Sequence, residues 1–189
     1  MLDDRKLKES SRIIKSMISD EKIVPAKEGS TAFFIDKSRQ SIAVASRLLT
    51  LESEEGLATD MWVINTSYYS MFFAATSLLA HHNHRIDSEQ GIHKLTYHAL
   101  IHFFVVEDKK LEKYFIEEYK DAIDEAEQLL QLSEQKTEQM LTDFENEIAK
   151  RKIFTYDLGR IAERKKAETS LKRAKSFFIT IEKMIGYPR

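Results

Sequence analysis

Apolar positions recur at helical spacing in almost every segment of this 189-residue chain. Near the N-terminus, Leu7, Ile14 and Ile18 form an apolar stripe that predicts a short basic helix. This helix should end before Pro25, because proline disfavours helical geometry at the residue that precedes it. No period-two alternation persists along the chain. The pattern therefore predicts an all-α fold, an up-and-down bundle of about six helices, one of them long and acidic.

Capping residues set the expected helix boundaries. Thr59 and Asp60 should start the third helix, and Asp87 with Gln90 has the spacing of a capping box for the fourth. Asp108 should cap the long acidic helix. The expected segments are an N-terminal helix and linker over residues 1–29, and a helical bundle over residues 30–189 whose extended helix runs around residues 108–150.

One stretch of the third helix, SYYSMFFAATSLL at residues 67–79, carries no charge in a chain with 32% charged residues. On a helix its small and aromatic residues fall on opposite sides. The small stripe is Ser67, Ser70, Ala74 and Ser77, and the aromatic stripe is Trp62, Tyr69, Phe72 and Phe73. A helix with these two stripes is expected to be buried in the centre of a bundle.

The same uncharged run extends from Met61 to Ala80, which is about the length of a membrane span. Its hydroxyl and amide side chains argue against a span, since such groups are costly in a bilayer. The N-terminal ten residues are polar and lack the apolar core of a signal peptide. We therefore expect a cytoplasmic protein without a membrane segment.

Charge is strongly segregated, although the net charge is only −2. Residues 107–149 hold 14 acidic and 5 basic side chains, whereas residues 150–189 hold 12 basic and 4 acidic ones. Such asymmetry is typical of a site for an anionic partner, and equally of two oppositely charged helices that lie near each other. Both interpretations stay open at this point.

The six histidines raise the question of a metal site. Three of them lie within residues 81–84, and His98 and His102 have the i, i+4 spacing that can chelate a metal. No carboxylate pair or Glu-x-x-His element accompanies them, and the chain has no cysteine. We expect no metal and no cofactor. His93 lies near a helix start, where the helix dipole disfavours protonation, so a neutral, hydrogen-bonding structural role is expected.

With these residues in view, the YYSMFFAATSLL run resembles the signature helix of the HEPN domain family, which consists of small all-α domains. The resemblance covers Phe34 to Ile185 and continues in order through a histidine-bearing helix, an arginine followed by a tyrosine, and a final helix. The residues that resemble the structural signature are Tyr68, Tyr69, Phe72, Phe73 and His93.

Many HEPN proteins are metal-independent ribonucleases or toxins, in which four to six residues separate an arginine from a catalytic histidine. Here Arg151 is followed by Tyr156 and Asp157, and no histidine occurs after His102. A tyrosine with a pKa near 10 is a poor general base at neutral pH. The pattern instead resembles a HEPN branch with an R-x-x-x-x-Y-D element. A purely structural interpretation is that Arg151 pairs with Asp157 and that Tyr156 packs under the final helix.

The leading hypothesis is a HEPN-like protein, non-catalytic or catalytically degenerate, that binds RNA, a nucleotide or a partner protein in a toxin–antitoxin or defence system. The candidate RNA- and phosphate-binding residues are Arg151, Lys152, Tyr156, Asp157 and Arg160. The first alternative is a metal-independent ribonuclease or toxin with Arg151 and Tyr156 as catalytic residues. The second is a purely structural dimeric helical protein. The resemblance implies a homodimer and a separate nucleotidyltransferase or antitoxin as partners.

Overall fold

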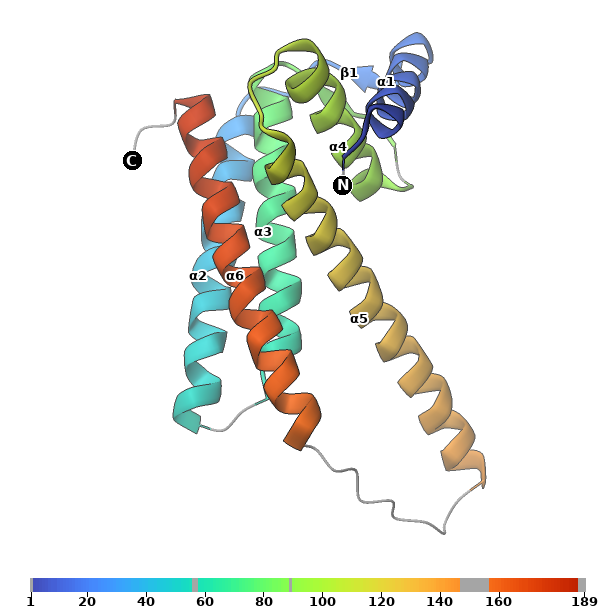
Figure 1. Cartoon of the computed structure of the whole chain (residues 1–189), viewed down its shortest axis with the longest axis vertical. Helices are drawn as coiled ribbons and strands as arrows, with labels where there is room; N and C mark the ends of the chain where they lie inside the picture. The colour runs from blue at the N-terminus through green and yellow to red at the C-terminus, as the bar shows by residue number, and fades with distance from the viewer. Residues whose placement is uncertain (1, 56–57, 89, 147–156, 187–189) are drawn as a thin grey trace.

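The computed structural model describes residues 2–55, 58–88, 90–146 and 157–186, with side chains for all of these except 52–55, 130–146 and 157–163. It shows a helical bundle with one small β-ladder, which confirms the all-α fold class (Figure 1). The elements are α1 (Asp4–Ser19), β1 (Ile23–Val24), α2 (Ser30–Glu55), α3 (Asp60–His81), β2 (Arg85–Ile86), α4 (Ile92–Leu100), the π-helix η1 (Ile101–Glu107), α5 (Lys113–Asn146) and α6 (Asp157–Ile185).

The small stripe of α3 lies against α2, as its composition predicts. Ser67, Ser70 and Ser77 are all buried. The Ser70 hydroxyl donates to the Ser38 carbonyl at 3.0 Å, and the Ser38 hydroxyl donates to the Ser70 carbonyl at 2.8 Å. The Ser77 hydroxyl donates to the Thr31 carbonyl at 2.9 Å. These bonds require the backbones of α2 and α3 to lie close together, which only small side chains allow. Helix α6 also packs against α3, and the three helices run side by side (Figure 1).

The aromatic stripe of α3 is only partly covered, so the expectation of a fully buried helix is wrong on this side. The side chain of Trp62 is 55% exposed and that of Tyr69 is 41% exposed, whereas Phe72 and Phe73 are half-buried. The physical reason is the length of the neighbour. Helix α4 has only nine residues and meets α3 near Phe72, where His93 packs and also contacts Tyr69, so α4 covers part of the stripe and leaves Trp62 largely exposed.

Two short strands form a ladder that the sequence analysis did not predict. Ile23 pairs with Ile86, and Val24 pairs with Arg85, in antiparallel register. A two-residue strand is too short to show an alternating pattern, so the local sequence did not predict it. The ladder joins the connection between α1 and α2 to the connection between α3 and α4.

Two predicted helix starts are wrong, and the third is confirmed. Thr59 is the N-cap of α3. The N-cap of α4 is Gly91 with a φ of 67°, and Asp87 pairs with the Arg85 side chain instead of capping a helix. Because Arg85 belongs to the ladder, the chain turns into a helix later than the capping pattern suggests. Asp108 ends η1, which continues α4 without a break, and α5 begins only at Lys113.

The core lies where α3, η1, α5 and α6 meet. Tyr119 of α5 and Phe177 of α6 are fully buried, and their rings stack with centroids 5.5 Å apart. Helix α1 joins the same core through the fully buried Ile14 and packs against α4 and η1. Within the described ranges, no helix combines the length and apolar character that crossing a membrane requires. The division into segments 1–29 and 30–189 stays a prediction.

Candidate functional site

The predicted phosphate ligands belong to a part of the chain without described side chains. Arg151, Lys152 and Tyr156 lie outside the described residues. Asp157 is the first residue of α6 and Arg160 follows in its first turn, but their side chains also lie outside the described part. A phosphate-binding or catalytic role for these five residues therefore stays a prediction.

The five residues of the resembled signature gather around the ring of His93. The ring centroid of Phe72 lies 4.2 Å from that of His93, and those of Tyr68 and Tyr69 lie at 5.3 and 5.9 Å. Phe73 joins the group through Tyr69, with centroids 6.0 Å apart. The cluster fastens α4 to the partly exposed face of α3, as expected for aromatic rings that pack at these distances.

The electrostatics of this cluster favour packing over proton transfer. Burial lowers the pKa of His93, while Glu127 of α5 acts in the opposite direction. Burial also raises the pKa of the Tyr68 hydroxyl far above its usual value. Both groups are therefore held neutral at pH 7. The neutral state of His93 agrees with the expectation from sequence, and desolvation is the largest cause of its lowered pKa. The expected hydrogen bond is not found at Nδ1, which is buried and has no partner among the described residues.

The acidic segment (residues 107–149) and the basic segment (residues 150–189) contact each other through α5 and α6. Arg173 of α6 lies 3.2 Å from Glu125 and 3.8 Å from Asp121, both on α5. The Ser170 hydroxyl donates to the same Glu125 carboxylate at 2.7 Å. Of the two interpretations of charge segregation, contact between oppositely charged helices therefore explains a part. A site for an anionic partner is expected where cations form no ion pair with a neighbouring carboxylate.

The histidines at i, i+4 on α4 and η1 hold α1 in place. His98 Nδ1 lies 2.9 Å from the Ser10 hydroxyl, and His102 Nδ1 lies 3.3 Å from the Ser11 hydroxyl. His102 is 2% exposed, and its Nε2 lies 3.3 Å from Glu107. Burial is the main cause that lowers the pKa of both histidines. In the described part of the chain, no group of three or more His, Asp or Glu side chains could hold a metal ion.

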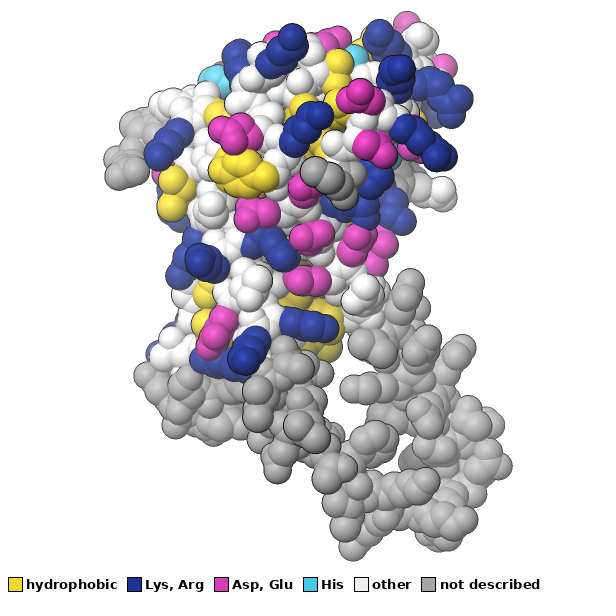
Figure 2. Space-filling model, viewed as in Figure 1, with side chains coloured by type: hydrophobic (Ala, Val, Ile, Leu, Met, Phe, Trp, Pro, Cys, Tyr) yellow, Lys and Arg dark blue, Asp and Glu magenta, His cyan; other side chains and the backbone are white. Residues whose placement is uncertain are grey.

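An open groove of about 660 Å³ runs between α1 and the end of η1. Three of its cations, Lys8, Arg12 and Lys15, follow the i, i+4, i+7 spacing of one helix face. Lys109 adds a fourth from the opposite rim, and Asp4 is the one carboxylate in the described lining. In Figure 2, Lys and Arg side chains gather at the upper right, where α1 lies in Figure 1.

The four cations of this basic groove lack ionic partners. Lys94, Lys110 and Lys120 each pair with a carboxylate elsewhere on the surface. Among the described residues, by contrast, no carboxylate pairs with the groove cations, which are Lys8, Arg12, Lys15 and Lys109. Positive charge that is gathered and has no ion pair within the described part of the chain attracts anions.

The rim of the groove has unusual backbone geometry. Residues 101–107 form a π-helix, a rare conformation that often occurs at functional sites. Lys109 follows with a φ of 52°, in the left-handed region that few non-glycine residues adopt. The turn is held by the backbone N–H groups of Lys110 and Leu111, which both donate to the Phe104 carbonyl at 2.9 and 3.0 Å. This turn places Lys109 opposite the basic face of α1.

This groove is not among the sites predicted from the sequence, although the spacing of the α1 cations pointed to it. The N-terminal helix is predicted to be basic, but the anion-binding site is predicted at residues 151–160. The spacing of Lys8, Arg12 and Lys15 would have identified one basic helix face. No local pattern could have added Lys109, which meets α1 only through the tertiary fold.

In comparisons with protein-family models and with curated proteins, no family model and no curated protein matches this chain.

Proposed function

We propose that this chain is a non-catalytic RNA-binding protein with a HEPN-type bundle, and that the basic groove contacts the RNA phosphates. The observation that carries the proposal is the set of four cations along one open groove, none of which has an ion pair with a described carboxylate. Lys8 and Lys15 are separated by about 10 Å along the helix axis. A line of charge of this length suits a polymeric anion better than a single phosphate group.

The chemistry of the groove matches that of a phosphate backbone. The Arg12 guanidinium can donate two parallel hydrogen bonds to one phosphate, and the lysines neutralise its neighbours. Val105 and Val106 add apolar surface from η1, against which a ribose or base can pack. Contacts of this kind bind RNA without reading its sequence.

The proposed absence of catalysis has its own support. His102 is the histidine nearest to the groove, but it is 2% exposed and already engaged by Ser11 and Glu107. A general base must reach the proton that it removes, and this imidazole lies beneath the groove surface. The resemblance to HEPN proteins without the catalytic histidine points in the same direction.

Fluorescence anisotropy with a labelled single-stranded RNA tests the proposal. Arg12→Glu should weaken binding by about tenfold or more, because it replaces a phosphate contact with a repulsive charge. Lys175→Glu is the matched control: Lys175 is an exposed α6 cation outside the groove, and its reversal should change the affinity little. An equal loss in both variants would contradict the assignment of the groove.

The same RNA, incubated with the protein in EDTA, tests the absence of catalysis. It should remain intact on a denaturing gel. Cleavage that disappears in Arg151→Ala and in Tyr156→Phe would instead support the metal-independent ribonuclease.

The proposed assembly is a homodimer through the open side of α3, with a separate nucleotidyltransferase or antitoxin as the further partner that the resemblance implies. Phe33, Trp62 and Tyr69 expose 55%, 55% and 41% of their surface. Ring contacts from Phe33 through Phe34 and Phe73 to Tyr69 make this part of the aromatic surface continuous, and Trp62 lies two turns before Tyr69 on α3. An apolar surface of large rings is typical of a subunit interface.

Analytical ultracentrifugation tests the dimer. The wild-type protein should sediment at twice the chain mass of 22.0 kDa, and Trp62→Glu should shift it to the monomer. Tyr114→Glu, at an exposed aromatic residue of α5, should leave the dimer intact. A monomeric wild type at micromolar concentration would refute this assembly.

A further inference from the structure

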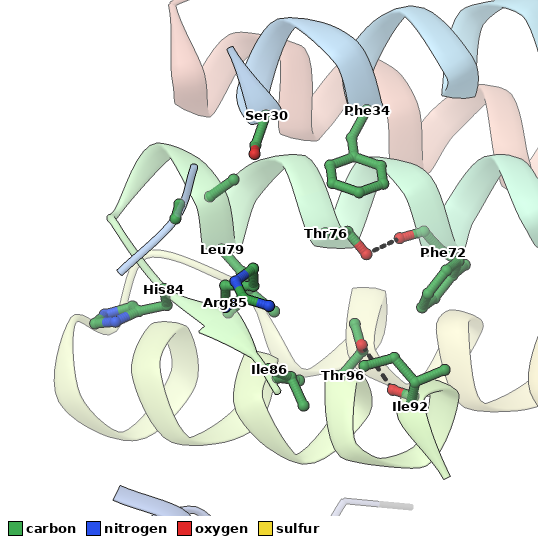
Figure 3. Close-up of a pocket in the computed structure, with 12 residues that line it drawn as sticks. Ser30, Phe34, Phe72, Thr76, Leu79, His84, Arg85, Ile86, Ile92 and Thr96 are labelled. Atoms are coloured by element: carbon green, nitrogen blue, oxygen red, sulfur yellow. Dashed lines mark hydrogen bonds between the residues drawn. The ribbon is translucent and has the colours of Figure 1, made fainter. Parts of the chain in front are cut away.

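A second hollow, a cavity of about 280 Å³, lies among α2, α3, β2 and α4 (Figure 3). Its walls are mostly apolar and include Phe34, Phe72, Ile86 and Ile92. These four large side chains stay only half-buried, although each belongs to a different packed element or segment. They are incompletely covered because they face this space, and burying apolar surface is the main source of affinity for a small ligand.

Arg85 of β2 supplies the one positive charge in the described lining. Its Nη1 donates to Asp87 at 3.0 Å, on the solvent side. Its Nε is shielded from solvent and has no acceptor among the described residues. In Figure 3 the side chain lies between Leu79 and Ile86, within the ring of lining residues. A buried donor without an acceptor is costly, so this N–H calls for an acceptor from beyond the described residues, such as a bound ligand.

Apart from Ser30, the other polar side chains of the lining already have contacts of their own. The hydroxyls of Thr76 and Thr96 donate to the carbonyls of Phe72 and Ile92, one turn earlier in their own helices, at 2.9 and 2.8 Å. His84 stacks on Phe103 with centroids 4.0 Å apart, and burial lowers its pKa. No carboxylate belongs to the described lining. The cavity is therefore apolar with a single cationic donor.

We propose that this cavity binds a small apolar carboxylate, whose ring system packs against Phe34, Phe72 and Ile92 and whose carboxylate accepts the Nε–H of Arg85. A cavity of about 150 Å³ holds one benzene ring, so this one has room for a fused pair. A hydrogen bond between a guanidinium and a carboxylate is among the strongest available to a protein. A phosphate group would bring more charge and more acceptors than one partly engaged guanidinium can match. The site is separate from the basic groove and does not depend on the function proposed for it.

Isothermal titration calorimetry with 2-naphthoate as the probe tests this site on the full chain. The neutral 2-naphthalenemethanol serves as the matched ligand, since it keeps the rings and loses the charge. Wild-type protein should bind naphthoate at least about tenfold more tightly than the alcohol. Arg85→Met should remove that preference, because the thioether keeps the apolar stem without the donor. Arg12→Met, in the basic groove, should leave both affinities unchanged.

A second variant tests the location independently of charge. Ala80→Leu adds bulk to the cavity wall and should abolish binding of both the acid and the alcohol. Failure of naphthoate to bind wild-type protein at millimolar concentration, or unchanged naphthoate binding in Arg85→Met, would overturn the proposal. RNA binding by Arg85→Met should match the wild type, so failure of this site and failure of the basic groove are distinguishable.

Discussion

The two hollows of this molecule use positive charge in opposite ways. The basic groove holds four cations that stand in water, whereas the Arg85 cavity holds one guanidinium whose Nε is shielded among apolar walls. A hydrated charge contributes little by itself, so binding in the groove depends on the number of phosphates that it neutralises. A shielded donor contributes more on its own, because the effective dielectric constant around it is lower. Affinity in the basic groove therefore depends on the number of charges, and affinity in the Arg85 cavity depends on desolvation of a single donor.

The two hollows also differ in how they are built. The groove exists because α1 is seated on His98 and His102, and the polar contacts with Ser10 and Ser11 set its position. The cavity lies where the β1–β2 ladder meets α2, α3 and α4, and backbone pairing of the ladder holds this region together without a titratable contact like those of His98 and His102. Changes in salt, pH and single hydrogen bonds should therefore affect the groove more than the cavity.

Salt should separate the two sites by the largest factor. Raising KCl from about 50 to 200 mM should weaken RNA binding about 50-fold, since four neutralised phosphates on a single strand give a logarithmic slope near −3. Naphthoate binding should change by less than about twofold, because its one ion pair is shielded from the solvent. Anisotropy and calorimetry at the same salt concentrations measure both. If RNA affinity and naphthoate affinity decreased by the same factor with salt, the two sites would not differ in how they use charge.

Acidification should test the histidines beneath the groove. Burial lowers the folded-state pKa of His98 and His102 below the usual value near 6.5. The unfolded chain then binds protons more readily, so stability is complete above about pH 6.5 and decreases as the pH falls toward the folded-state pKa. Between pH 7.5 and 5.5 we therefore expect the melting temperature to decrease.

Thermal denaturation followed by circular dichroism measures this loss. The double variant His98→Asn and His102→Asn should lose less stability on acidification than the wild type. His84→Asn, at the cavity, is the comparison, and the pKa of His84 is also lowered by burial. If both variants flatten the pH dependence equally, the groove histidines have no special role.

A single hydroxyl should produce the smallest effect. Ser11→Ala removes the partner of His102 Nδ1 and should cost about 0.5–1.5 kcal/mol of unfolding free energy, measured in urea. Ser19→Ala is the control on the same helix, because the Ser19 hydroxyl donates only to an exposed carbonyl of Lys15. Naphthoate binding should be unchanged in both variants. Equal stability of the two variants would show that Ser11 does not anchor α1.

Local spacing was enough to predict most of the fold. The helical class, the N-cap at Thr59 and the small stripe against α2 all follow from residues within a few turns of one another. The predictions that fail depend on where the tertiary structure places each segment. Asp87 does not cap a helix because its carboxylate pairs with Arg85 of the ladder. Trp62 stays exposed because α4, with nine residues, is too short to cover it.

The sequence by itself determined that Lys8, Arg12 and Lys15 share one helix face, since 3.6 residues per turn place them there whatever surrounds the helix. Only the tertiary structure decided that Lys109 completes the groove and that the Nε of Arg85 is shielded beside a cavity. The physical reason is that periodicity is a property of one segment. Desolvation depends on which other segments, far away in the chain, displace the water.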